Sequence, residues 1–342
     1  MQAVVIEKPG EVVVREVPDP APGPEEVVVA VKACGICGTD IHIFDGEFGP
    51  ARYPLIPGHE FAGEVVSAGE RAPADLMGRS VTVDPSVFCG RCRPCREGRG
   101  NLCENWNAIG DTMAGACAEL VAVPYWNARP LPTGFDMSLA ALVEPLSCAV
   151  HGYDVLAPKL GDRFLIYGAG TMGLLLLALA PHAGALSVSV VDPNPSRREL
   201  ALAMGATEAV STSAELGSEG GYEVVIDATG VVGAVEDALR HVGRGGKFLQ
   251  FGVTAQDAVA RFSPFRLYND EQRFQGSMAV LASFDRAADI AVNLDLGLGR
   301  LVTDRFSLSS YPEALEHVRR GKGLKSQVVP AAGGAAPAGR SL

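Results

Sequence analysis

The sequence has no long apolar run and no excess of positive charge. Its most apolar stretch, residues 172–180, is much shorter than the ~20 residues that a membrane-spanning helix needs. The 342 residues carry a formal net charge of −11, which argues against a broad surface for nucleic acid or anionic lipid. We therefore expect no nucleic-acid partner and no membrane partner for this chain.

The start of the sequence also lacks the positively charged segment of a secretory leader. We therefore expect a cytoplasmic protein in which the eight cysteine thiols stay reduced. Hydrophobic residues make up 47% and charged residues 20% of the chain, which is typical of a globular protein. The length allows two domains, each with a core of its own.

Four of the eight cysteines follow the pattern CxxCxxCx7C: Cys89, Cys92, Cys95 and Cys103. Thiolates at this spacing can surround one Zn²⁺ ion tetrahedrally. The residues between them are mainly glycine and arginine, which bury little apolar surface, so this lobe needs a metal ion to order it. The alternative, two surface disulfides, would suit a secreted protein better. The pattern therefore predicts a structural zinc.

A second set of metal donors lies nearer the N-terminus. Cys37 stands in a glycine-flanked turn after the apolar run 27–31, and His59 and Glu60 follow a proline-rich approach. A thiolate, an imidazole and a carboxylate suit a catalytic zinc that keeps one position open. A lone cysteine is usually a core residue and a lone histidine usually a structural one. Together with the four cysteines, however, this set predicts a second zinc ion per subunit.

A dinucleotide-binding pattern begins at residue 163. A short apolar strand leads into a glycine-rich turn and then an apolar helix, and the next strand, 187–191, ends in Asp192. The turn contains Gly168, Gly170, Thr171, Met172 and Gly173. Glycines let the backbone approach a pyrophosphate, and an acidic residue about twenty positions later can bind the ribose hydroxyls. Because Asp192 would repel a 2′-phosphate, NAD is favoured over NADP, although Arg197 and Arg198 could accept that phosphate.

These motifs together resemble the zinc-dependent medium-chain dehydrogenase/reductases, the alcohol dehydrogenase superfamily, over nearly the whole chain. The run from Gly58 to Gly63, with Gly69 and Ala72, is similar to the zinc signature of that superfamily, and the four cysteines are similar to its structural-zinc lobe. The segment Glu144-Pro-Leu-Ser147 resembles the sorbitol or polyol dehydrogenase branch.

The resemblance implies a zinc-dependent oxidation of a secondary hydroxyl of a polyol or diol to a ketone, by hydride transfer from a zinc-bound alkoxide to NAD. It also implies a proton relay from Thr39 through the cofactor ribose to His42. Without that role, Thr39 would be a turn-capping hydroxyl and His42 a surface histidine. Glu60 and Glu144 compete as the third protein ligand of the catalytic zinc, and their order of contact stays open.

The substrate is less well defined than the reaction. Polyol dehydrogenases tend to carry an Arg-Tyr pair after the last Rossmann strand, where this sequence has Ala279 and Val280. A pentitol, a cyclitol, an amino-alcohol such as threonine and a secondary diol therefore all stay possible. Two further alternatives are a zinc-free, NADPH-dependent quinone or enoyl reductase and a non-enzymatic dinucleotide-binding protein. The donor set and the relay would serve no purpose in either.

The predicted fold class is α/β plus β. Residues 1–147 predict a GroES-like β-barrel catalytic domain with the structural-zinc lobe at about 89–103, and residues 148–278 predict a Rossmann domain with a doubly wound parallel sheet. Residues 279–342 would return to the catalytic domain and end in a loose tail from 331 to 342. The family relation also predicts a homo-oligomer, a dimer or a tetramer, assembled through the strand near residue 273.

Overall fold

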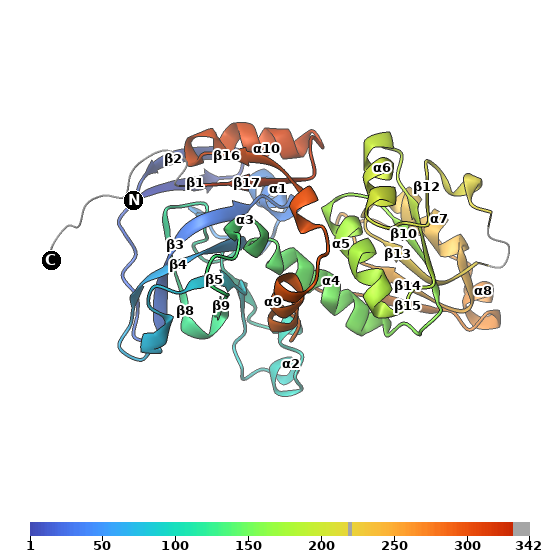
Figure 1. Ribbon diagram of the computed structural model, residues 1–342, viewed down its shortest axis with the longest axis horizontal. Helices are drawn as coiled ribbons and strands as arrows, with labels where there is room; N and C mark the ends of the chain where they lie inside the picture. Colours follow the sequence, from blue (N-terminus) through green and yellow to red (C-terminus); the bar gives the residue numbers. More distant parts are fainter. Residues whose placement is uncertain (218–220, 331–342) are drawn as a thin grey trace. The chain divides into compact units, whose positions relative to one another are not determined.

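The computed structural model describes residues 1–217 and 221–330, and the chain divides into two compact units (Figure 1). The first unit combines Met1–Glu144 with the segment that starts at Gly299, and the second runs from Pro145 to Leu298. The tail expected at 331–342 lies outside the described residues.

A seven-stranded sheet forms the framework of the first unit, in the order β16-β17-β3-β4-β5-β9 with β8 also paired to β3. Its strands are β3 (Glu26–Gly35), β4 (Glu60–Ala68), β5 (Ser80–Val83), β8 (Leu120–Pro124), β9 (Ala128–Pro130), β16 (Val302–Phe306) and β17 (Lys325–Val328). The first half of β3 pairs with β8, whereas its end, at Cys34 and Gly35, pairs with β17. The predicted β-rich character of this region is confirmed.

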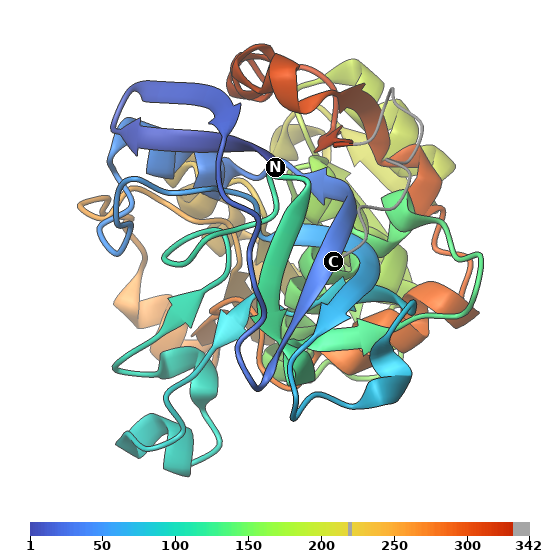
Figure 2. The same cartoon turned by 90° about the vertical axis from the view of Figure 1, so that its left-hand side faces the viewer.

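Two smaller antiparallel pairs complete the strands of this unit. β1 (Gln2–Lys8) and β2 (Glu11–Glu16) form the dark blue hairpin of Figure 2. β6 (Ser86–Val87) pairs with β7 (Asn107–Ala108), and the four-cysteine segment, with the short helix α2 (Arg93–Arg96), lies between them in sequence. The pairing of β6 with β7 therefore closes the base of the four-cysteine lobe.

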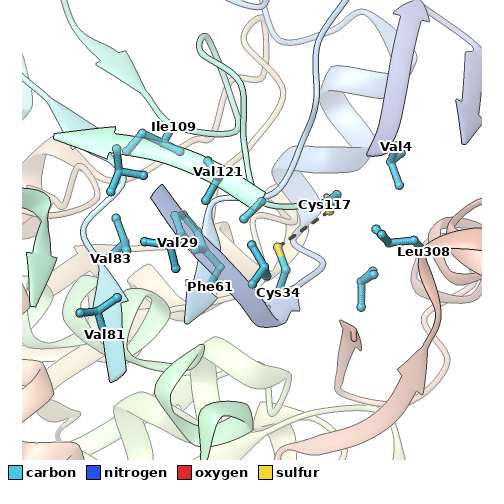
Figure 3. Packing of buried hydrophobic residues seen from close by; sticks show 14 of the residues in the cluster. Val4, Val29, Cys34, Phe61, Val81, Val83, Ile109, Cys117, Val121 and Leu308 are labelled. Carbon is cyan, nitrogen blue, oxygen red and sulfur yellow. Dashed lines mark hydrogen bonds between the residues drawn. The ribbon is translucent and has the colours of Figure 1, made fainter. Parts of the chain in front are cut away.

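Alternating apolar residues of the strands build the core of the first unit (Figure 3). Val29 of β3, Phe61 of β4 and Val121 of β8 are at most 3% exposed. The thiols of Cys34 and Cys117 are fully buried in the same cluster, with their Sγ atoms 3.8 Å apart. This packing holds the end of β3 in place, and Cys37 follows three residues after Cys34.

The segment that starts at Gly299 belongs to the first unit, whereas the sequence predicts this return from residue 279. It contains the helix α10 (Tyr311–Arg319) and the strand β17. Arg319 forms an ion pair of 2.6 Å with Asp45, the last residue of α1 (Gly38–Asp45). The first unit also contains the short helix α3 (Met137–Ala140).

The second unit is built on six parallel strands in the order β12-β11-β10-β13-β14-β15. The strands are β10 (Arg163–Tyr167), β11 (Ser187–Val191), β12 (Glu208–Val210), β13 (Tyr222–Asp227), β14 (Val242–Gln250) and β15 (Arg273–Gly276). The helices are α4 (Val143–Leu156), which carries the division between the units, α5 (Thr171–Leu179), α6 (Pro195–Ala203), α7 (Val232–Arg240), α8 (Pro264–Asn269) and α9 (Phe284–Asn293). The predicted parallel sheet is confirmed, and β12 is a strand that the sequence did not indicate.

The division of the chain differs from the predicted boundaries at residues 147 and 278. The second unit begins at Pro145 and continues to Leu298, so that α9 belongs to it. Four residues of α9 at helical spacing are buried: Phe284, Ala287, Ala288 and Ala291. Arg286 of α9 also pairs with Asp154 of α4 within the same unit. A helix with a buried apolar face thus extends this unit beyond its last strand.

No helix in the described ranges has both the length and the apolar character that crossing a bilayer requires.

Candidate active site and metal centres

The four cysteines of the predicted structural-zinc lobe converge on one point. The Sγ atoms of Cys89, Cys92, Cys95 and Cys103 all lie within 4.8 Å of one another, and none of these residues forms a disulfide. Backbone N–H groups donate to the sulfurs, from Cys92 to Cys89 at 3.4 Å and from Asn105 to Cys103 at 3.3 Å. Backbone donors at Arg91 and Cys92 lower the pKa of the Cys89 thiol to about 6. The lobe therefore fits a tetrahedral metal ion and not a pair of disulfides.

The arginines of this lobe are only partly available to balance the charge of the thiolates. Arg93 donates to Glu97 at 2.8 Å, and Arg99 also pairs with Glu97. These ion pairs are exposed, so solvent screens them and each contributes little to stability. The sulfur cluster, and not its charged rim, is therefore the feature that can order the segment.

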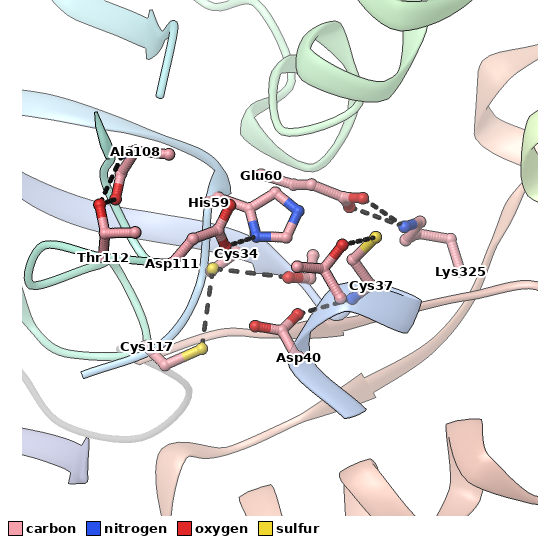
Figure 4. Close-up of polar contacts among 12 residues, drawn as sticks. Cys34, Cys37, Asp40, His59, Glu60, Ala108, Asp111, Thr112, Cys117 and Lys325 are labelled. Carbon is pink, nitrogen blue, oxygen red and sulfur yellow. Dashed lines mark hydrogen bonds and ion pairs between the residues drawn. The ribbon is translucent and has the colours of Figure 1, made fainter. Parts of the chain in front are cut away.

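The second predicted donor set also comes together, entirely within the first unit (Figure 4). One donor atom each of Cys37, His59 and Glu60 lies within 4.8 Å of the other two. Cys37 caps the N-terminus of α1, where its backbone N–H donates to Asp40 Oδ2 at 2.8 Å. His59 and Glu60 stand at the start of β4, immediately after Gly58. A thiolate, an imidazole and a carboxylate at these positions fit a zinc site with room for a further ligand.

Glu60 has a partner that the sequence did not reveal. Lys325 Nζ donates to both carboxylate oxygens of Glu60, at 2.8 and 2.7 Å, and both side chains are nearly inaccessible to solvent. Burial alone would lower the pKa of Lys325, but the charge of Glu60 more than reverses this and raises it. Gly35 makes room for the pair, because a Cβ atom there would lie 2.1 Å from Glu60 Oε2. The only sequence signal for this contact is a lysine at the start of an otherwise uncharged strand.

Glu144, the competing carboxylate, lies in the first turn of α4. It is 7% exposed, and its charge contributes to raising the pKa of Lys325. It is not one of the three residues whose donor atoms lie within 4.8 Å of one another. Of the two glutamates, Glu60 is therefore the one that the structure brings into the donor cluster.

The two residues of the predicted proton relay lie on α1, one turn apart. Thr39 Oγ1 is 3.7 Å from Cys37 Sγ, next to the donor cluster. His42, which shares a helix face with Thr39, has a half-exposed side chain, and its Nδ1 lies 2.8 Å from Glu47 Oε2. Glu47, another residue that the sequence did not single out, follows the left-handed C-cap Gly46. Thr39 places a hydroxyl beside the donor cluster, and His42 places an imidazole that solvent can reach on the same helix. This arrangement suits the transfer of a proton from the cluster to solvent.

The glycine turn of the second unit has the geometry that its sequence predicts. Gly168 has a positive φ of 96°, and a Cβ atom at Gly173 would lie 1.8 Å from the carbonyl oxygen of Gly168. At Gly170, by contrast, the nearest atom to an added Cβ is Arg197 Nη1 at 4.0 Å. Thr171 is the first residue of α5, so backbone N–H groups are available at this helix start. The turn is therefore tightly packed at Gly173 and open at Gly170.

Asp192, the predicted ribose acceptor, is more constrained than its sequence position suggests. Its Oδ2 accepts from Ala169 N at 2.7 Å and its Oδ1 accepts from Asn194 N at 2.8 Å. The side chain is 4% exposed. Asp192 thus fastens the glycine turn to the end of β11, and each oxygen has one further lone pair for a ligand.

Asp227, at the end of β13, supports the same turn and was not predicted. Its carboxylate accepts from Thr229 N, Thr229 Oγ1, Gly230 N and Gln250 Nε2, at 2.6 to 3.1 Å. These bonds hold Thr229 against the turn, because a Cβ atom at Gly168 would lie 3.0 Å from Thr229 Cγ2. A single aspartate at a strand end is too common a feature to indicate this role.

Two protein-family models match the chain. The alcohol dehydrogenase GroES-like domain matches residues 23–133, and the zinc-binding dehydrogenase model matches residues 171–293. The first match lies within the first unit and the second within the parallel-sheet unit.

Individual relatives cover almost the whole chain. The chain is 35% identical to D-arabinitol dehydrogenase 1 of Uromyces fabae, over 96% of this chain and 97% of that protein. It is 33% identical to L-threonine 3-dehydrogenase of Saccharopolyspora erythraea, over 90% of this chain and 92% of that protein.

Solved structures show the same fold. A zinc-binding dehydrogenase of Sinorhizobium meliloti bound to NADP has a TM-score of 0.91 and 37% identity, covering 96% of this chain and 99% of that one. An alcohol dehydrogenase of Escherichia coli complexed with NADH has a TM-score of 0.88 and 28% identity, with the same coverage. The GroES-like and Rossmann fold expected from the sequence is confirmed.

Replacing Cys95 with serine tests the four-cysteine lobe. We expect the bound zinc to fall from two ions to one per chain and the melting temperature to drop, because the affinity of a structural zinc contributes to folding. Metal analysis of desalted protein measures the first effect and thermal unfolding the second. Cys148→Ser, outside both donor groups, should keep two ions. A Cys95→Ser protein that also keeps two would refute the assignment.

The glycine turn can be tested with two alanine substitutions. Gly173→Ala should destabilise the second unit by about 1–3 kcal/mol or more, because its Cβ would lie 1.8 Å from a backbone oxygen. Gly170→Ala should change stability by less than about 0.5 kcal/mol. It should nevertheless weaken dinucleotide binding at least tenfold (about 1.4 kcal/mol), because a methyl group would occupy the approach to the pyrophosphate. Urea unfolding and fluorescence titration with NADH separate the two effects, and wild-type NADH binding by Gly170→Ala would contradict the expectation.

Proposed function

Because this chain belongs to the zinc-containing medium-chain alcohol dehydrogenase superfamily, we propose that it oxidises a secondary hydroxyl of a polyol or related diol to a ketone, with NAD as the hydride acceptor. The observation that carries the proposal is the convergence of Cys37, His59 and Glu60 within 4.8 Å, beside Thr39. A binding protein without catalytic activity would have no use for an open set of metal donors adjoining a hydroxyl and a histidine.

The two donor sets serve different purposes. Cys89, Cys92, Cys95 and Cys103 would hold a structural zinc with no position left for substrate. Cys37, His59 and Glu60 would hold the catalytic zinc. When bound, this zinc supplies a Lewis acid that makes the substrate hydroxyl more acidic, and NAD supplies the acceptor for the hydride.

The chain's own residues then have to carry the proton of the substrate hydroxyl from the donor cluster to solvent. Thr39 Oγ1, next to the donor cluster, can accept a hydrogen bond from the substrate hydroxyl and, as it takes that proton, release its own hydroxyl proton toward His42. His42 is half exposed and can pass a proton to solvent. The carboxylate of Glu47 accepts a hydrogen bond from His42 Nδ1, because a carboxylate has no proton to donate. This leaves His42 Nε2 as the nitrogen that receives the proton.

We propose Glu60 as the closer carboxylate of the catalytic site, because its donor atom and not that of Glu144 belongs to the donor cluster. Without a metal ion, Cys37, Glu60 and Lys325 together carry a formal charge of −1 if the thiol is ionised. A divalent cation then makes this group positive by one charge, which attracts a substrate oxygen that is losing its proton. Glu144 would add a negative charge if it bound the metal directly, so we place it outside the ligand set.

NAD is the proposed cofactor because the carboxylate of Asp192, at the end of the second strand of the glycine-turn motif, would repel a 2′-phosphate. Arg198 offers little compensation, since its Nη1 is bound to the carbonyl oxygens of Asp192 and Pro193, both at 2.9 Å. Arg197 lies near the open side of Gly170 and is the arginine that could meet a phosphate. The related Sinorhizobium meliloti enzyme was solved with NADP, so both cofactors belong in any assay.

A polyol or diol substrate is supported by the similarity to an arabinitol dehydrogenase. At the position of the Arg-Tyr pair of polyol dehydrogenases, Ala279 has a φ of 43° and Val280 is 2% exposed. Neither residue offers a side-chain hydrogen bond to a hexitol. A smaller polyol or a secondary diol therefore fits better. L-threonine is the second candidate, because L-threonine 3-dehydrogenases are also relatives at 30–35% identity.

A homo-oligomer, dimer or tetramer, is proposed from the edge of the parallel sheet. β15 is the last strand of that sheet and has no partner on its outer side among the described strands. Phe265 and Tyr268 of the preceding helix α8 are 71% and 85% exposed. An open strand edge near exposed aromatic residues is a surface that a second copy could cover.

The cytoplasm is the proposed location, because both metal sites need reduced thiols. None of the eight cysteines forms a disulfide. Six of them lie close to another thiol, namely the pair Cys34 and Cys117 and the four-cysteine cluster, so an oxidising compartment could convert them to disulfides.

A substrate survey tests the function. Reduction of NAD and of NADP is followed with pentitols, hexitols, secondary diols, L-threonine and primary alcohols. We expect turnover of at least one polyol or secondary diol, faster with NAD than with NADP. Turnover of L-threonine alone would favour the second candidate. No turnover by protein that contains two zinc ions and binds NADH would indicate a dinucleotide-binding protein without this activity.

Substitutions separate the roles of the donor cluster and the relay. Cys37→Ser should abolish turnover, because the catalytic zinc loses its thiolate. His42→Ala should lower activity about ten- to a hundredfold at neutral pH and recover it at higher pH, when hydroxide replaces the lost base. Rate profiles against pH and NADH titrations measure these effects, and NADH binding should persist in both. His182→Ala, an exposed histidine of the second unit, is the control. An unchanged His42→Ala profile would exclude His42 from the relay.

A further inference from the structure

Asp111 contacts the Nδ1 atom of the His59 ring. We propose that Asp111 is a positioning residue that fixes the ring orientation and the tautomer of His59, so that Nε2 is the nitrogen presented to the catalytic zinc. The inference rests on the proposed zinc site. Asp111 was not indicated by the sequence, because it lies fifty-two residues after His59 and outside every motif.

The contact is short and buried. His59 Nδ1 and Asp111 Oδ1 lie 2.9 Å apart, and the two side chains are 7% and 9% exposed (Figure 4). The contact is bent away from ideal hydrogen-bond geometry, and neither atom has a hydrogen-bond partner elsewhere in the described part of the chain. Each atom therefore depends on the other, since leaving a buried polar group without any partner is costly.

The chemistry of the pair determines the tautomer. An ionised carboxylate can only accept a hydrogen bond, so the proton of the neutral imidazole has to sit on Nδ1. The lone pair of His59 then lies on Nε2, which is the form a metal ion requires.

The backbone around Asp111 is shaped to deliver its carboxylate to this place. Gly110 has a positive φ of 91°, and a Cβ atom there would lie 2.4 Å from the carbonyl group of Gly58. A Cβ atom at Gly115 would lie 2.5 Å from the same oxygen. Backbone hydrogen bonds fasten the two segments, with Ala116 N donating to Gly58 O at 2.9 Å and Gly115 N donating to Ile56 O at 2.8 Å. The loop of Asp111 thus packs backbone to backbone on the segment that carries His59.

Asp40 is the other carboxylate near His59, and one of its two oxygens is committed elsewhere. Its Oδ2 accepts from Cys37 N at 2.8 Å, as part of the cap of α1. Burial raises the pKa of Asp40 to about 6, whereas the charge of His59 works in the opposite direction. Asp40 therefore interacts with His59 at a distance, while Asp111 contacts the ring.

The test measures zinc affinity and not turnover. Asp111→Leu removes the acceptor and keeps a branched side chain, although a larger one, and Asp111→Asn keeps an acceptor oxygen but removes the charge. Zinc is withdrawn from each protein with a chelator of known affinity, and the more weakly held ion is assigned to the catalytic site by repeating the titration on Cys95→Ser. We expect catalytic zinc to bind about 10–100-fold more weakly in Asp111→Leu and about tenfold more weakly in Asp111→Asn.

A spectroscopic measurement shows whether the ligand field itself changes. Co²⁺ placed in the catalytic site should give a shifted visible spectrum in both variants, an effect that loss of stability alone would not produce. Asp75→Asn, an exposed carboxylate of the same unit, should match the wild type in affinity and spectrum.

The outcomes distinguish this inference from the proposed function. If wild-type protein binds only one zinc ion and Cys95→Ser binds none, the assignment of the catalytic site itself is wrong. If the wild type binds two, and Asp111→Leu binds the catalytic ion with wild-type affinity and spectrum, Asp111 does not position His59. Should Asp111→Leu fail to fold, Asp111→Asn decides: an affinity within twofold of the wild type and an unchanged cobalt spectrum would overturn the inference.

Discussion

The buried ion pair between Glu60 and Lys325 is the interaction on which the first unit depends. Removing one partner of such a pair leaves an uncompensated charge in the interior and costs about 3–5 kcal/mol. Lys325 is the first residue of β17, and the end of that strand pairs with β3 just before Cys37. The same contact therefore balances the charge of a metal donor and holds the strand that precedes another donor. Stability and chemistry are coupled at this point of the structure.

Three glycines near the site are as necessary to it as the donor residues, because a side chain at any of these positions would collide with its neighbours. Gly35 leaves the space that the Glu60 carboxylate occupies, and Gly58, with a φ of 100°, lies where a Cβ atom would come within 2.7 Å of two buried thiols. Gly110 lets a loop reach the backbone beside His59. Because these spaces are closed by backbone or buried atoms, no neighbour can move aside to accept a methyl group. The donors are thus held by contacts that tolerate almost no change in shape.

Sequence reasoning could predict what is encoded over short distances. The CxxCxxCx7C pattern, the glycine turn with Asp192 and the alternation of strands and helices each depend on neighbouring residues, and the structure bears out the metal clusters and the parallel sheet. The extent of the second unit could not be predicted, because α9 packs through an ordinary amphipathic pattern. Lys325, Asp111 and Glu47 were missed for a related reason. Each acquires its role only from a residue that the fold brings beside it, and nothing in its own neighbourhood marks it.

The two metal centres differ in how much of the chain must exist before each is complete. The four cysteines lie in one short segment, so this cluster can assemble while synthesis continues. Glu60 gains its counter-charge only from a residue made 265 positions later. At ~5–20 residues per second on the ribosome, that interval is roughly 10–50 s. During that time the nascent first unit carries an unbalanced carboxylate beside its thiolate and imidazole. The four-cysteine cluster can therefore be completed early in synthesis, whereas the cluster of Cys37, His59 and Glu60 can gain its counter-charge only near the end.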